Sequence, residues 1–449
     1  MRKSLILLHF AFAVAAQSAA AQVRLTLGDA FRLADSAAFA NRIAGGTARA
    51  AGGQANSALQ GILPTVRAEA GYVRTDNPLA AFGYQLQQRS ITMASFDPAL
   101  LNYPAPVNNW NGGVVAEVPL INVDAWFGRA AGTSAAASAQ AQAGWTREST
   151  RLDVTRAYFG AVLARERVTN LEAAAAAAQA DQRQAESMVA NGLATKSDAL
   201  LSSVQSGQVE AQLIGARGQA DIARERLALI LGQPGDTSFT LPDSLPTADR
   251  IRALAAQGKS DTAAARLDVA AAQLGLQAAQ RDSRRADAQY LPRLNGFGRY
   301  DWNSPTQPFS GQGSYTVGLI ASWSPFAGAS ELAQRQTAQG RAEAAQAAAE
   351  GAAAGARLEQ DAMRTQLTVA LAQLGIAETA VAQGAEAYRI VGRKYAGGLA
   401  TIAELLGAEA VETQTRLGLS DARYQAIVAE AAARQADGLD LMALTALEN

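Results

Sequence analysis

The sequence contains no cysteine, and its single histidine is His9, close to the N-terminus. Without cysteine, an exported form of the chain has no disulfide framework and no thiol nucleophile, and it cannot carry a lipid on an N-terminal cysteine. Without a histidine after position 9, Ser-His and Cys-His pairs are excluded, as is zinc held by His or Cys ligands. We therefore predict no catalytic residues, no metal site and no cofactor.

The chain also lacks a block of positive charge and a long hydrophobic run. Its 39 Lys and Arg residues are scattered and stand against 40 Asp and Glu residues. Nucleic-acid binding needs a basic patch, so we expect no nucleic-acid partner. After the N-terminal segment, no stretch has the roughly 18 apolar residues of a membrane helix. Any membrane-spanning part must therefore be a β-barrel.

The N-terminal segment has the layout of a secretory signal peptide. Arg2 and Lys3 precede an apolar run from Leu5 to Ala16, which is followed by small residues that lead to Ala19-Ala20-Ala21. A positive start, a short apolar run and an A-x-A pattern are typical of a cleaved signal. We predict a signal peptide at 1–21, with cleavage after Ala21 or close to it.

The rest of the chain is duplicated. Leu63-Pro64 resembles Leu291-Pro292, and two later landmarks also recur, each 206 positions further on. The later pairs are Pro119 with Pro325 and Gly192-Leu193-Ala194-Thr195 with Gly398-Leu399-Ala400-Thr401. Three landmarks in one order indicate two copies of one structural unit. The Gly- and Pro-rich stretch around 232–246 separates them, so we predict a first repeat at 22–232, a linker at 233–248 and a second repeat at 249–449.

Each repeat contains a very long helix-forming stretch. No proline occurs from about Ala130 to Ala190, and a similar Ala-rich stretch runs from about Ser330 to Ala396. The first of these is roughly 90 Å of helix at 1.5 Å per residue. Such lengths are typical of a coiled coil or an extended bundle rather than of an ordinary globular core.

Each repeat also contains two strand-like stretches with alternating side chains. They lie near 63–74, 110–120, 291–302 and 314–325. About ten alternating residues with aromatics near the ends is what a transmembrane barrel strand needs, with one face toward lipid and the other toward water. The 75–109 stretch, rich in Pro and Asn, is expected to be a long extracellular loop. Four strands cannot close a barrel, so the chain must oligomerise if they span a membrane.

With these features, the mature chain resembles the TolC-like outer membrane factor family along essentially its whole length. The resemblance is carried by the signal peptide, the two helix–strand–strand–helix repeats, the two Leu-Pro elements and the two Gly-Leu-Ala-Thr turns. It implies a mainly α fold with a transmembrane β-barrel, in which a homotrimer forms a 12-stranded β-barrel in outer-membrane lipid and a 12-helix periplasmic α-barrel. It also implies two partners, a periplasmic adaptor protein and an inner-membrane pump of the resistance-nodulation-division or ABC type.

The resemblance also implies a functional site at the two turns. The turns have hairpin chemistry in their own right, because a glycine can end one helix and a threonine can cap the next. In the family, the corresponding tips touch the adaptor; here they are Gly192, Leu193, Ala194, Thr195, Gly398, Leu399, Ala400 and Thr401. The periplasmic gate is expected to involve Asp198, Tyr395 and Glu404. Gly407 and Ala400 depart from acidic and basic positions of the family, which leaves the gating network open.

Several functions remain compatible with the sequence. We expect an exit duct for small molecules, while a duct for type I protein secretion or for metal ions remains possible because the pump selects the cargo. A pore-free periplasmic coiled-coil scaffold would explain the Ala-rich helices but not the four strands. An exported enzyme could use paired carboxylates such as Asp76 and Asp97, although nothing in the sequence orients them.

Overall fold

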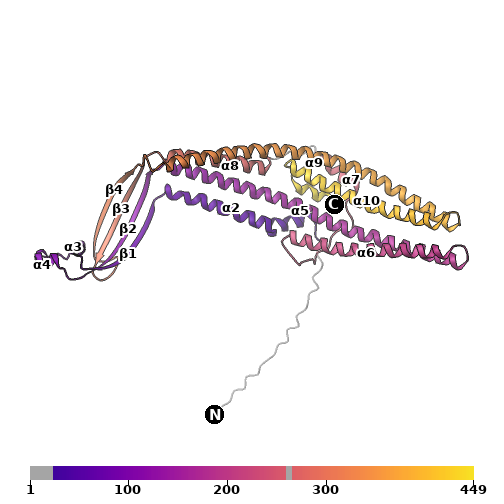
Figure 1. Cartoon of the computed structure of the whole chain (residues 1–449), viewed down its shortest axis with the longest axis horizontal. Coiled ribbons are helices and arrows are strands. Elements are labelled where there is room, and N and C mark those ends of the chain that lie inside the picture. Colours follow the sequence, from indigo (N-terminus) through magenta and orange to yellow (C-terminus); the bar gives the residue numbers. More distant parts are fainter. Residues whose placement is uncertain (1–23, 259–264, 449) are drawn as a thin grey trace, which may run out of the picture.

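The computed structural model describes residues 24–258 and 265–448, so the predicted signal peptide lies outside the described residues. The molecule is a long rod with β-strands at one end and two helical hairpins at the other (Figure 1). Apart from short helices, its two halves have the same order of helices and strands, and this confirms the predicted duplicated helix–strand–strand–helix fold. The first half comprises α1 (Leu27–Ala37), α2 (Phe39–Ser57), η1 (Ala58–Gly61), β1 (Thr65–Thr75), β2 (Val107–Ile121), α5 (Val123–Ala190) and α6 (Lys196–Ile230). The second comprises α7 (Ala248–Gly258), α8 (Leu267–Ala288), β3 (Arg293–Ser304), β4 (Gln312–Ser322), α9 (Ser330–Ala396), α10 (Ile402–Ala436) and η3 (Leu441–Leu447).

The connection between β1 and β2, which we expected to be a long loop, is partly helical. It contains α3 (Pro78–Gln87), the short η2 (Met93–Phe96) and α4 (Pro98–Asn102). The proline that begins each α-helix follows a capping residue, because Asn77 accepts a hydrogen bond from the Ala80 amide and Asp97 from the Ala99 amide. Proline at the first helical position has the required φ and needs no hydrogen-bond acceptor. The prolines here start helices instead of excluding them.

The four strands form one antiparallel sheet in the order β1-β2-β3-β4. The register pairs Tyr72 with Trp110, Val114 with Tyr300 and Tyr300 with Tyr315, so these side chains share one face. The same register places further apolar side chains on that face: Val66, Ala68, Ala70, Ala116, Val118, Trp302, Val317, Leu319 and Ala321.

The opposite face of the sheet is more polar, although it also carries Val73, Val115, Phe297 and Ile320. It carries an ion pair between Arg67 and Glu117 at 2.9 Å, and the Asn109 amide donates to the Asn303 side-chain oxygen at 2.8 Å. β1 and β4 each have a neighbour on one side only. The sheet thus has one apolar face, one more polar face and two unpaired edges.

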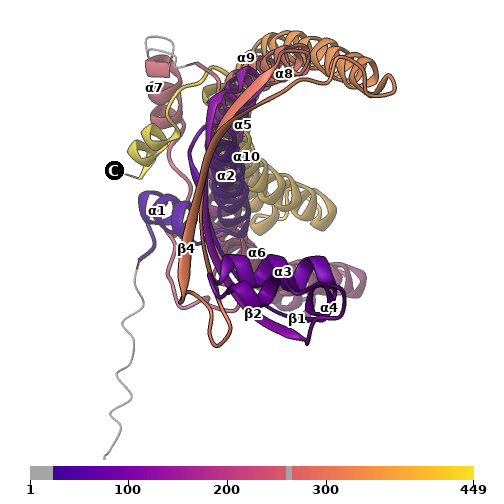
Figure 2. The ribbon, with the colours of Figure 1, turned by 90° about the vertical axis from the view of Figure 1, so that its left-hand side faces the viewer.

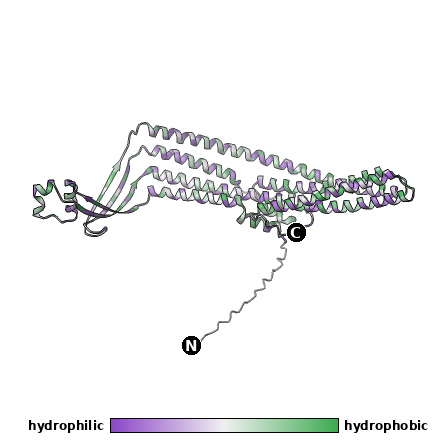
Figure 3. Cartoon of the chain, turned by 60° about the horizontal axis from the view of Figure 1, so that its bottom comes forward, coloured by the Kyte–Doolittle hydropathy of each residue, from purple (hydrophilic) through white to green (hydrophobic). Residues whose placement is uncertain are grey.

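The helices extend the curved layer that the sheet begins. α5 contacts α2, α6, α8 and α10, whereas α9 packs against α8 and α10. Viewed along the rod, the chain forms an open arc, with α1, α7 and the C-terminus on one side of it (Figure 2). Hydrophilic and hydrophobic residues alternate along the long helices (Figure 3). In the part of the chain that the structure describes, no helix is long and apolar enough to cross a membrane.

The main core lies midway along the rod, where both ends of the described chain meet α5. Phe31 of α1, Tyr158 of α5 and Ile427 of α10 are fully buried there. The Tyr158 hydroxyl donates to the Leu25 carbonyl at 2.9 Å, and the Leu27 amide donates to the Glu448 carboxylate at 2.8 Å. These bonds fasten α1 and the C-terminal segment to the middle of α5.

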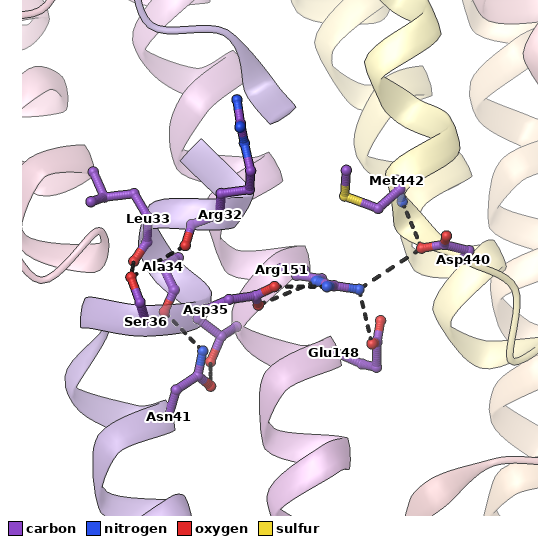
Figure 4. Close-up of polar contacts among 11 residues, drawn as sticks. Arg32, Leu33, Ala34, Asp35, Ser36, Asn41, Glu148, Arg151, Asp440 and Met442 are labelled. Carbon is purple, nitrogen blue, oxygen red and sulfur yellow. Dashed lines mark hydrogen bonds and ion pairs between the residues drawn. The ribbon is translucent and has the colours of Figure 1, made fainter. Parts of the chain in front are cut away.

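A cluster of charged residues joins the same three segments, and Figure 4 shows Arg151 of α5 at its centre. The Arg151 guanidinium lies 2.7 Å from Asp35 at the end of α1, 3.2 Å from Glu148 and 3.8 Å from Asp440. One cation therefore neutralises carboxylates from three parts of the chain. We call Asp35, Glu148, Arg151 and Asp440 the Arg151 cluster.

Candidate functional site at the hairpin tips

The tip between α5 and α6 is a tight turn whose geometry follows from its sequence. Gly192 has φ +73°, a left-handed conformation that glycine adopts without strain. The Leu193 amide then reaches back to the Met188 carbonyl at 2.8 Å, which closes the helix end. Thr195 begins α6 with a capping box, because its side chain accepts from the Asp198 amide and Asp198 accepts from the Thr195 amide at 2.9 Å.

The tip between α9 and α10 repeats this construction. Gly398 has φ +73°, and the Leu399 amide donates to the Lys394 carbonyl at 2.7 Å. Thr401 forms the capping box with Glu404, whose carboxylate accepts from the Thr401 amide at 2.7 Å. Hydrogen bonds from the Thr401 amide and hydroxyl lower the pKa of Glu404, so this exposed carboxylate stays ionised below its usual range.

The two tips present apolar side chains to solvent. Leu193 is 73% exposed and Leu399 82% exposed. The two turns that carry them lie at the end of the rod that is far from the sheet (Figure 1). Ala194 and Ala400 beside them are half-buried, while Thr195 and Thr401 are exposed. Paired exposed leucines on rigid capped turns form a surface suited to binding another protein.

The predicted gate residues are close to the tips but are not bonded to one another. Tyr395 is buried, and its hydroxyl has no hydrogen-bond partner among the described residues. Burial and the nearby charge of Asp198 raise the pKa of Tyr395. The carboxylates of Asp198 and Glu404 are instead engaged in the capping boxes of their own helices.

An apolar cluster behind the tips holds the two hairpins together. Ala185 of α5 packs with Tyr395, Ile402 and Leu405 of the second hairpin, and all four are nearly or fully buried. Each turn is therefore closed by hydrogen bonds within its own hairpin, and the two hairpins pack against each other just behind the turns.

Sequence reasoning missed a group of polar residues next to this cluster. The Tyr388 hydroxyl of α9 donates to Asp181 of α5 at 2.8 Å, and Glu409 of α10 is buried nearby. The available signal was spacing, because Glu409 lies four residues after Leu405 and seven after Ile402, in the buried stripe of α10. Among residues 24–258 and 265–448, no group of three or more His, Cys, Asp or Glu side chains could hold a metal ion.

The sequence matches one known protein family over most of its length. A family profile described as "Outer membrane efflux protein" matches residues 46–233 and 259–439. No curated protein sequence matches the chain.

Several solved structures share the fold over nearly the full chain. The outer membrane protein VceC of Vibrio cholerae has a TM-score of 0.75 at 20% identity, covering 92% of this chain and 96% of VceC. The CmeC outer membrane channel of Campylobacter jejuni has a TM-score of 0.74 at 13% identity, covering 97% and 94%. The open state of the MtrE outer membrane channel of Neisseria gonorrhoeae has a TM-score of 0.71 at 17% identity, covering 92% and 89%. At these identities the similarity is one of fold.

Proposed function

The chain belongs to the outer membrane efflux protein family, and on this premise we propose that three copies of this outer-membrane protein form the exit duct of a tripartite system that exports small molecules. A periplasmic adaptor would bind the hairpin tips, and an inner-membrane pump of the resistance-nodulation-division or ABC type would supply the energy. The duct itself would be a passive pore without catalytic residues.

The observation that carries this proposal is the sheet, which has one apolar face, one more polar face and unpaired edges on β1 and β4. Its apolar face suits lipid and its polar face suits a water-filled lumen. An unpaired strand edge is not tolerated in lipid, because the exposed backbone groups have no water to bond. Three copies would pair β1 of each chain with β4 of the next and close a barrel of twelve strands.

The helical part supports the same assembly. α5 has 68 residues and α9 has 67, so each is about 100 Å long at the rise of an α-helix. The open arc of Figure 2 would become a closed wall of twelve helices in a trimer. The leucine-bearing tips would then form its periplasmic end, where an adaptor could reach them.

Site-specific photocrosslinking in intact cells tests this function. A photoreactive residue at Ala194 or Ala400 should capture an adaptor protein, which mass spectrometry then identifies. The matched control is the same residue at Ala94, which is exposed at the opposite end of the rod and should capture no adaptor.

The identity of the captured protein decides between the possible cargoes. An adaptor of a resistance-nodulation-division pump supports small-molecule efflux, whereas an adaptor of a protein-secreting ABC exporter indicates type I secretion. If neither tip captures an adaptor while the protein is abundant, the tip assignment is wrong. A protein that purifies without detergent as a single chain would instead favour the scaffold.

A further inference from the structure

Glu409 of α10 is the most unusual titratable group outside the tips. Its side chain is only 1% exposed, and neither carboxylate oxygen has a hydrogen-bond partner among the described residues. An ionised carboxylate in such a place loses its hydration without compensation. The structure therefore favours a proton on Glu409 when the helices are packed as they are here.

The surroundings of Glu409 are acidic. Asp181 of α5 is 8% exposed and accepts the hydroxyl proton of Tyr388 of α9 in its hydrogen bond. Glu412 follows on α10, where it is paired with Arg416 at 2.7 Å. No Lys or Arg forms an ion pair with Glu409 or Asp181 in the described part of the chain. Tyr395 of α9 also lies within reach of the charges of Asp181 and of Asp198 of α6. Burial, and then the charges of Asp181 and Glu412, raise the pKa of Glu409 to about 7; burial also raises the pKa of Asp181.

The position of this pair connects it to movement of the tips. Asp181 lies four residues before Ala185 on α5, and Glu409 lies four residues after Leu405 on α10. Ala185 and Leu405 belong to the apolar cluster that joins the hairpins. The two acids therefore lie one helical turn behind that cluster, on opposite sides of the same contact.

We propose that Asp181 and Glu409 form a proton-operated latch between the two hairpins of one chain, in which a proton on the pair keeps the hairpins packed and its loss separates them. The latch rests on the proposed function only in treating the hairpin tips as the mouth of the duct.

The direction of the pH dependence follows from proton linkage. When the hairpins are packed, Glu409 keeps its proton up to about pH 7. When they are separated, its water-exposed carboxyl has the usual pKa near 4.5 and loses the proton at lower pH. Packing is therefore fully favoured below pH 4.5 and is weakened as the pH rises toward 7. Because one proton is released, the separation equilibrium increases by at most about tenfold per pH unit in this window.

Distance measurement by electron paramagnetic resonance tests the latch. The chain has no cysteine, so cysteines that replace Leu193 and Leu399 carry the only spin labels. Both sites are exposed, and one lies on each tip. Coexpression with an excess of the cysteine-free chain leaves at most one labelled copy in each assembled particle. We expect the distance between the labels to lengthen from pH 5 to pH 8.

Three variants separate the latch from other causes. Glu409→Gln, which cannot ionise, should keep the short distance at both pH values. Asp181→Asn removes a charge that raises the pKa of Glu409, so the packed state tolerates the ionised carboxylate better and the distance should lengthen less at pH 8. Glu386→Gln, the control, changes the same kind of charge at an exposed site on α9 and should behave as the native chain.

A native distance that does not change with pH would overturn the latch, as would a transition that persists in Glu409→Gln or an equally large lengthening in Asp181→Asn. The adaptor-capture experiment fails or succeeds independently, so a failed latch leaves the proposed duct intact.

Discussion

Replacing Arg151 with methionine removes the only cation that binds three carboxylates in the Arg151 cluster. Methionine keeps much of the length and apolar stem of arginine, so the main change is the lost charge. The exposed side-chain fractions are 18% for Arg151 and 28% for Asp35 and for Glu148, so these groups are only partly hydrated. Asp440 is 68% exposed and contributes less.

The cost of this substitution can be estimated from burial and geometry. Removing one partner of a fully buried ion pair costs about 3–5 kcal/mol, whereas an exposed pair is worth about 0–1 kcal/mol. The ion pair between Arg151 and Asp35, 2.7 Å apart, is partly buried, so the cost of losing it lies between these two limits. We therefore expect a loss of about 2–3 kcal/mol in the free energy that holds α1 against α5. This loss corresponds to a roughly 30- to 150-fold increase in local opening.

The free energy lost in Arg151→Met should increase as the pH rises. Burial already raises the pKa of Glu148, while Arg151 opposes that shift. Without the arginine, the pKa of Glu148 in the folded state rises further. The contribution of Glu148 to packing is then present only at low pH and is lost as the pH rises through that raised pKa. The free energy that holds α1 against α5 should therefore differ least between Arg151→Met and the native protein near pH 4, and most near pH 8.

Hydrogen–deuterium exchange of the purified protein measures this opening directly. Peptides from 27–37 and 438–448 should exchange faster in Arg151→Met, after correction for the intrinsic effect of pH, while those from the hairpin tips should not change. Arg32→Met is the control, because its pair with Asp29 lies on the surface, with Arg32 77% exposed. Equal rates in the variant and the native protein, or faster exchange along the whole chain, would refute the reasoning.

Three further predictions concern the sheet and the tips. Val317→Arg places a charge on the apolar face and should cost about 2–4 kcal/mol at mid-membrane depth, so the amount assembled in the outer membrane should fall, whereas Thr316→Arg on the polar face should assemble normally. Glu404→Gln should reduce cation preference in planar-bilayer recordings, and unchanged selectivity would rule out a ring of Glu404 at the entrance. Thr401→Ala removes the side-chain cap of α10 and should cost about 1 kcal/mol, seen as faster amide exchange in the first turn of α10 only.

The parts of the structure that local patterns determine could be predicted from the sequence. Alternation within a strand separates the residues that the register places on one face, such as Val66, Ala68 and Tyr72 of β1. The long helix predicted from about Ser330 to Ala396 has those bounds in the structure. Period-2 alternation and the absence of proline are properties of a few consecutive residues, and a sequence shows them directly.

The parts that depend on contact between distant segments could not be predicted in this way. The helices are so rich in alanine that their buried faces are poorly marked, and buried positions of α5 include Ser134, Thr150 and Thr155. Nothing local shows that Asp181 lies near residues of α9 and α10. The short helix after Pro98 was missed for another reason, because proline was taken as a sign of a loop when it also begins helices.

The duplication itself separates residues that build a hairpin from residues that serve another purpose. Asp198 and Glu404 lie 206 positions apart and cap their helices in the same way, so each hairpin needs an acid there. The position equivalent to Glu409 in the first half is Ser203, which is exposed. A buried acid is therefore not required at this position of a hairpin, since the first hairpin forms with an exposed serine there. Glu409 occurs in one copy only, and it lies at the contact between the two hairpins. This is the pattern expected of a residue that controls how the hairpins associate.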